Sequence, residues 1–176
     1  MTDSITIGAF PDRSPDEWPS YLAYLVSFST VGAVWVGHTV ITEFLVRATP
    51  VLIRLNLLLL MVVSFLPFPT KLGAEYVGEE RPERIAATIY GLNLLLTAVL
   101  LSVIWRYAVR EGLIRSDIAD ENVKVLTRRL TPGLVGYVVM IMLGLFLPVV
   151  AVVGYFVIAV YNLIPIRDLR RRKASA

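Results

Sequence analysis

The sequence predicts an all-α integral membrane protein, a helical bundle with about five transmembrane helices. Of its residues, 56% are hydrophobic and 18% are charged, and the mean hydropathy is +0.69. These values lie outside the range of ordinary soluble domains. The charged residues also gather between long apolar blocks instead of alternating with apolar residues along helix faces. Such blocks are typical of membrane spans.

The apolar blocks set the predicted helices. A bilayer core about 30 Å thick needs roughly 20 residues of helix. The predicted membrane domain covers residues 18–166, with spans at about 18–46, 51–68, 85–105, 133–147 and 148–166. The last two spans come from one block that is too long for a single span, and Pro148 near its middle is expected to break the helix. A polar segment, 1–17, precedes the spans and lacks a signal-peptide pattern. A basic tail, 167–176, follows them.

The positive charges predict the orientation of the chain. With five spans and the N-terminus outside, most of the 17 Lys and Arg lie on the inner side, and the outer side holds Arg13, Lys71, Arg81 and Arg84. With four spans the tail changes sides and this asymmetry disappears. Because cytoplasmic loops are enriched in Lys and Arg, the count favours five spans with the tail in the cytoplasm.

The segment between the third and fourth predicted spans is expected to be partly helical. IADENVKVLTRRL places Val123 and Leu126 on one face with charge opposite. Such a segment would lie on the membrane surface or meet a partner subunit. Just before it, Trp105 and Tyr107 are predicted to lie in an interfacial aromatic belt.

A stripe of polar and aromatic residues follows the first predicted span, and it contains His38, the only histidine. At 100° per residue, the members of this stripe fall within an arc of about 80°. We predict that the stripe faces other helices, because polar groups at membrane depth need hydrogen-bond partners. Asn56 and Asn93 lie in the next two spans. The stripe contains Tyr24, Ser27, Trp35, His38 and Thr42, and the predicted interhelical polar network comprises Ser27, Trp35, His38, Asn56 and Asn93.

This network has two interpretations. In the first, its polar groups hold helices together, as intramembrane polar residues commonly do. In the second, His38 belongs to a proton or ion path, because imidazole titrates near neutral pH. No Asp, Glu or Lys lies within the core of a predicted span to relay protons onward. The sequence therefore favours the packing role.

The sequence does not favour an enzyme, a cofactor or a metal site. Cysteine is absent, and no P-loop, HExxH or serine elbow occurs. The strings LVGYV (134–138) and VVGYF (152–156) are similar to the TVGYG filter of potassium channels, but both lack its second glycine and lie in apolar helix. We interpret their glycines as sites of close helix packing. The basic residues at the ends of apolar blocks indicate topology and not nucleic-acid binding.

Several longer strings carry a resemblance to a known family. They are WPSYLAYLVSF, WVGH, RLNLLLL, SFLPFPT and LTRRLTPGL, and together they cover the chain from Trp18 onward. In these strings the chain resembles the transmembrane protein 175 family, the lysosomal potassium channels and their bacterial relatives. The resemblance implies six-helix subunits that form homotetramers in the bacterial plasma membrane. It also implies passive conduction of K⁺ through a central pore with an apolar constriction and no TVGYG filter.

One feature of that family is absent from this sequence. The family's first helix lines the pore and carries Arg-x-x-x-Phe-Ser-Asp, and no such string occurs here. We therefore expect the pore-lining helix to be missing, which leaves the pore-lining residues unknown. By the family pattern, Trp35, His38 and Asn56 would support that helix. Either the chain starts inside a longer gene, or the short form is genuine and does not conduct or pairs with another subunit.

The resemblance predicts a potassium channel subunit whose partners are the lipid bilayer and further copies of itself. One alternative is a non-conducting membrane scaffold, in which the polar groups serve helix packing alone. Another is a proton-coupled transporter that uses His38. Such a transporter would be expected to have broken helices or inverted repeats, and the sequence indicates neither.

Overall fold

The computed structural model describes residues 18–75, 80–118 and 120–163, and these form an all-helical bundle. Among these residues the only β-type pairing is an isolated bridge between Leu45 and Ile114. The predicted all-α membrane fold is confirmed. The predicted N-terminal segment 1–17 and tail 167–176 lie outside the described residues. The helices are α1 (Trp18–Glu43), α2 (Pro50–Ser64), α3 (Pro67–Glu75), α4 (Glu80–Arg110), α5 (Asp120–Gly144) and α6 (Pro148–Leu163).

The membrane-spanning segments follow the apolar blocks. In the described part of the chain, four segments are long and apolar enough to cross a bilayer: Tyr24–Glu43, Pro50–Gly73, Arg81–Arg110 and Asp120–Gly144. The apolar helix at Pro148–Ile158 is shorter. The fifth span therefore stays a prediction that rests on the distribution of positive charge.

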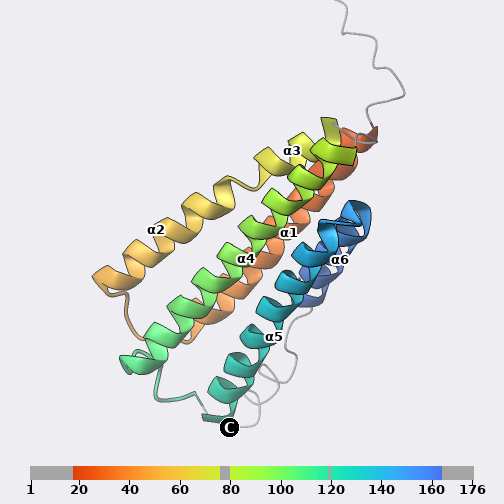
Figure 1. Cartoon of the computed structure of the whole chain (residues 1–176). Helices are drawn as coiled ribbons and strands as arrows, with labels where there is room; N and C mark the ends of the chain where they lie inside the picture. Colours follow the sequence, from red (N-terminus) through yellow and green to blue (C-terminus); the bar gives the residue numbers. More distant parts are fainter. Residues whose placement is uncertain (1–17, 76–79, 119, 164–176) are drawn as a thin grey trace, which may run out of the picture.

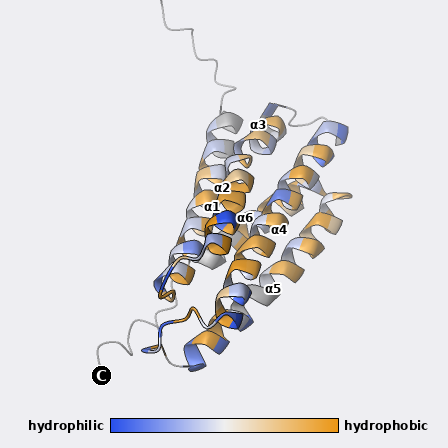
Figure 2. Cartoon of the chain, turned by 90° about the vertical axis from the view of Figure 1, so that its left-hand side faces the viewer, coloured by the Kyte–Doolittle hydropathy of each residue, from blue (hydrophilic) through white to orange (hydrophobic). Residues whose placement is uncertain are grey.

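Helix α4 is the centre of the bundle and packs against each of the other five helices. In Figure 1, α2 and α3 run end to end along one side of α4, while α5 and α6 form an antiparallel pair along the other. Helix α1 packs against α3, α4 and α6. Hydrophobic residues fill the middle of the bundle, and hydrophilic residues gather toward its two ends (Figure 2).

The buried apolar side chains form two clusters at different heights along α4. One cluster lies where α1 and α4 end, and it includes Ile41, Leu52 and Trp105. The other lies nearer the start of α4, around Tyr90 and Tyr155. The first cluster packs the ends of α1 and α4 together, and the second joins the α5–α6 pair to the rest of the molecule.

The segments that follow α1 and α4 are fastened together by backbone atoms. The Val46 N–H donates to the Leu113 carbonyl at 2.9 Å, and the Arg115 N–H donates to the Phe44 carbonyl at 2.9 Å. The chain can turn back here because Gly112 has a φ of 61°, a conformation that glycine adopts without steric cost. These two bonds, which we call the loop clasp, place the ends of α1 and α4 at the same end of the bundle.

The second span is broken between α2 and α3. In a continuous helix the carbonyls of Val63 and Phe65 would accept from residues 67 and 69, but both of these are proline and have no N–H. The chain instead tightens, so that Leu66 donates to Val63 at 3.1 Å and Phe68 donates to Phe65 at 3.1 Å. The predicted span 51–68 is therefore two helices, and the second of them continues to Glu75.

The boundaries of the last helix pair differ in one respect from those predicted. Helix α6 begins at Pro148, the residue at which the sequence predicts a break. Helix α5 begins at Asp120, well before residue 133, because the amphipathic segment joins the span without interruption. The expected helical character of that segment is confirmed. Leu126 is buried and Val123 packs against the same cluster.

Candidate functional site: polar contacts between the spans

The imidazole of His38 lies between α1 and α2. Its Nε2 is 2.8 Å from Oδ1 of Asn56, so the Nε2–H donates and the amide oxygen accepts. On the other side, the ring of Trp35 stacks on the imidazole, with 5.8 Å between the ring centroids. The structure therefore brings together three of the five residues predicted to form the polar network.

The predicted stripe on the first span does not face the helices of this chain as a whole. Ser27 is buried, but Tyr24 is 68% exposed and Trp35 is 62% exposed. The buried face of α1 is rotated away from the stripe and contains Thr30 and Ile41. Within this chain Ser27 is buried and His38 contacts α2, whereas for Tyr24 and Trp35 a contact with helices outside the chain stays a prediction. The period of 100° correctly grouped the polar residues but could not show which edge of the group is buried.

Asn93 makes a separate contact at the break in the second span. Its Nδ2 donates to the carbonyl of Val62 at 3.1 Å, and this carbonyl also accepts from the Phe65 N–H at 3.2 Å. Asn93 is 8% exposed, and its Oδ1 is buried with no hydrogen-bond partner among the described residues. A neighbouring helix thus supplies a donor to a backbone group close to the prolines, as is usual where proline interrupts a membrane helix.

A third contact joins α1 to α4 near the second apolar cluster. The hydroxyl of Thr30 donates to the Val26 carbonyl at 2.8 Å, so the Tyr90 hydroxyl, 2.8 Å away, donates to Thr30 Oγ1. The ring of Tyr90 lies 5.7 Å from that of Tyr155, centroid to centroid. Thr30 and Tyr155 were not predicted from the sequence. Thr30 could have been found from its position one helical turn after Ser27.

Glycine allows the rings and side chains of this region to pack closely. A Cβ at Gly91 would overlap the hydroxyl end of Tyr155, and a Cβ at Gly154 would overlap the sulfur of Met140. Gly154 belongs to VVGYF and Gly136 belongs to LVGYV, and both strings lie within helices α5 and α6. The interpretation of these strings as packing sites is confirmed for Gly154. Neither string has the extended backbone that an ion filter requires.

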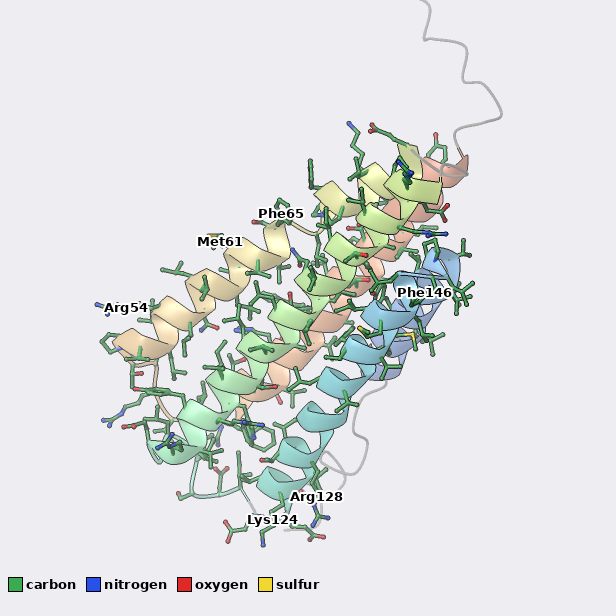
Figure 3. The ribbon with its side chains drawn as sticks, in the orientation of Figure 1. Arg54, Met61, Phe65, Lys124, Arg128 and Phe146 are labelled. Atoms are coloured by element: carbon green, nitrogen blue, oxygen red, sulfur yellow. The ribbon has the colours of Figure 1, made fainter. Side chains whose placement is uncertain are left out.

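The charged side chains lie at the ends of the bundle. Arg54 is exposed near the start of α2, and Lys124 and Arg128 project from the lower end of α5 in Figure 3. Within residues 18–75, 80–118 and 120–163, no three His, Asp or Glu residues gather in a way that could hold a metal ion. The polar groups found at membrane depth are therefore amides, hydroxyls and one imidazole. The imidazole and the amides of Asn56 and Asn93 bond to other helices, whereas most of the hydroxyls bond to carbonyls of their own helix.

The His38–Asn56 hydrogen bond gives a testable prediction. His38→Ala or Asn56→Ala should each lower stability in detergent by about 1 kcal/mol, a typical value for an interhelical hydrogen bond. Because both changes remove the same bond, the double variant should cost less than the sum of the two single variants. The measurement is thermal unfolding of all three variants. Thr39→Val is the matched control, since Thr39 donates only to the Trp35 carbonyl of its own helix. Strict additivity, or unchanged melting in both single variants, would argue against the contact.

Comparison with known proteins places these features in a family. Residues 6–67 match the family model described as endosomal/lysosomal potassium channel TMEM175. A potassium channel from Streptomyces collinus is 38% identical over 122 residues, and the match covers 69% of this chain and 59% of that protein. A potassium channel from Chamaesiphon minutus is 38% identical over 148 residues, which is 82% of this chain and 71% of that protein.

A solved structure agrees with the sequence matches. The crystal structure of a lysosomal potassium-selective channel TMEM175 homolog from Chamaesiphon minutus superposes with a TM-score of 0.73 at 33% identity. The superposition covers 82% of this chain and 72% of that chain. The fold, the identity and the extent of these matches together show that this multi-pass membrane protein belongs to the TMEM175 family.

Proposed function

We propose that this chain is a subunit of a potassium channel, in which K⁺ flows passively down its gradient. The observation that carries the proposal is the superposition, over 82% of the chain, on the crystal structure of a homolog described as a potassium-selective channel. The intramembrane groups fit passive flow, since those that contact one another between helices are amides, hydroxyls and one imidazole. The imidazole is bonded to Asn56 in a packing contact, and we propose no cofactor and no enzymatic activity.

The pore belongs to an assembly and not to one subunit. The bundle around α4 is filled by two apolar clusters, which leave its interior as packed core. We therefore place the pore at the centre of a homotetramer, with an apolar constriction that limits ion passage by dewetting. The assembly lies in the bacterial plasma membrane with its basic tail in the cytoplasm, as the positive-inside rule favours.

The exposed edge of α1 is where we place a further helix of the assembly. Tyr24, Phe28 and Trp35 are each more than 60% exposed on this edge, and a Cβ at Gly32 would meet no atom within 4 Å. The open space at Gly32 and the small size of glycine make this a surface that suits close packing of another helix. Trp35, stacked on His38 and through it linked to Asn56, would fix one side of that helix.

Flux measurement tests the proposed function. Purified protein in liposomes that hold a potassium gradient should release K⁺ faster than protein-free liposomes do. The flux should need no proton gradient and should survive His38→Ala, apart from the modest loss of stability predicted above. Absence of flux would overturn the channel and favour a scaffold. Flux that requires a proton gradient and vanishes in His38→Ala would instead identify a proton-coupled transporter.

A further inference from the structure

Helices α2 and α3 belong to one membrane span but are anchored very differently. Helix α3 packs against both α1 and α4, whereas α2 packs closely against α4 alone. Three apolar residues of α2 are buried on that side, namely Leu52, Leu59 and Val62. Most of the remaining surface of α2 is exposed, and Figure 3 shows Arg54, Met61 and Phe65 on the side that faces away from α4.

The backbone between these two helices is less tightly bonded than a helix interior. Pro67 and Pro69 withdraw two donors, and the i−3 bonds that replace them have the poorer geometry of a 3₁₀ turn. Proline is a usual cause of sharp bends in helices, and hinges are formed by a few residues at the ends of elements. Residues Phe65 to Pro67 therefore have the properties of a hinge.

Two polar contacts fasten α2 to the body of the molecule at different distances from this hinge. Close to it, the Asn93 side chain of α4 donates to the Val62 carbonyl. Farther along α2, Asn56 accepts from His38 of α1. A single hydrogen bond of this kind contributes on the order of 1 kcal/mol in a membrane. Each contact is strong enough to bias the position of α2, and it acts together with the apolar packing of Leu52, Leu59 and Val62 against α4.

We propose that α2 is a movable arm, hinged at Phe65–Pro67 and latched to the body by Asn93 and His38. The body consists of α1, α3, α4, α5 and α6, and it stays fixed while the arm moves. Helix α2 has 15 residues and is about 22 Å long. A swing of about 15° around the hinge would move its far end by about 6 Å, which is comparable to the helix shifts of known conformational switches.

The motion can be measured as a distance between spin labels, because the chain contains no cysteine to be removed first. One label replaces Ile53 near the far end of the arm, and the other replaces Val125 on α5, which lies across α4 from α2 (Figure 1). Both positions are more than a third exposed. A control pair at Glu43 and Val125 joins two helices of the body. The full chain in lipid nanodiscs is used throughout.

Three variants set the expected outcome. The arm pair should give a broader distance distribution than the body pair. Removing both latches with Asn93→Leu and Asn56→Ala should increase the population shifted by about 6 Å several-fold. Restoring the two backbone donors with Pro67→Ala and Pro69→Ala should narrow the same distribution, which tests the hinge without weakening the latches. Thr97→Val is the control on α4, because Thr97 bonds only to the Asn93 carbonyl of its own helix.

Other results would overturn the proposal. If the arm pair is as narrow as the body pair and neither set of substitutions changes it, α2 is not an arm. If the body pair broadens equally in the unlatched variant, the whole bundle has loosened and the hinge is not specific. The distances are measured without ion flux. The proposed motion of α2 can therefore be disproved while the proposed channel function is supported, and the reverse is also possible.

Discussion

Gly91→Ala should lower the stability of the protein in detergent by about 3 kcal/mol, toward the upper end of the usual cost of overpacking. The added Cβ would overlap the hydroxyl end of Tyr155 and would lie 2.8 Å from Cγ1 of Ile141. Tyr155 is fully buried and cannot withdraw toward lipid without opening the second apolar cluster. The measurement is the midpoint of thermal or denaturant unfolding.

A matched control and a second-site change sharpen this test. Gly133→Ala adds the same methyl group on α5, where it would meet no atom within 4 Å. It should therefore leave stability unchanged or raise it slightly through helix propensity. Tyr155→Leu shortens the side chain that overlaps, so Gly91→Ala should cost much less in that background than alone. Equal melting of Gly91→Ala and Gly133→Ala would show that Tyr155 does not occupy the place described.

Trp105→Ala should lower stability by about 4 kcal/mol, since truncating a large buried ring leaves a cavity. Trp105 is 1% exposed, and the ring of Phe44 meets it edge to face at 5.8 Å between centroids. Its indole Nε1–H donates to Oγ1 of Thr127 at 2.9 Å, which ties α4 to the amphipathic part of α5. Unfolding of the purified protein again gives the measurement.

Two milder substitutions separate the contribution of the ring to stability from the contribution of its hydrogen bond. Thr127→Val removes the acceptor at nearly constant volume and should cost about 1 kcal/mol. Trp105→Phe keeps most of the apolar contact and should fall between Thr127→Val and Trp105→Ala. If Trp105→Ala costs no more than Thr127→Val does, the indole is not part of the core.

Trp105 also shows where reading the sequence alone fails. A tryptophan at the end of an apolar block is typical of an interfacial belt, and the sequence predicts that position for it. The structure buries it instead, because the amphipathic start of α5 covers it and supplies a hydroxyl for the indole N–H. Local sequence gives the height of a residue in the membrane. It cannot show that another segment, more than twenty residues later, covers the same surface.

The polar contacts could likewise be predicted from the sequence only in part. The apolar blocks sufficed to place His38, Asn56 and Asn93 at membrane depth, and all three make interhelical hydrogen bonds. The partner of Asn93 is a backbone carbonyl. Every residue has such a carbonyl, so the sequence does not indicate which one accepts. The break that lies beside that carbonyl could have been predicted from Pro67 and Pro69, whose missing donors are visible in the sequence. Which edge of α1 is buried depends on its packing against α3, α4 and α6, and the sequence of α1 alone does not determine it.

The loop clasp has a consequence for how such subunits change over evolution. Its two hydrogen bonds join the backbone atoms of Phe44 and Val46 to those of Leu113 and Arg115, so they do not depend on which side chains stand there. Substitutions can therefore accumulate in both loops while α1 and α4 keep a common depth in the bilayer. An inserted or deleted residue in either loop would instead shift the pairing and slide one span against the other. Tolerance to substitution and intolerance to length changes are thus expected at the same few positions.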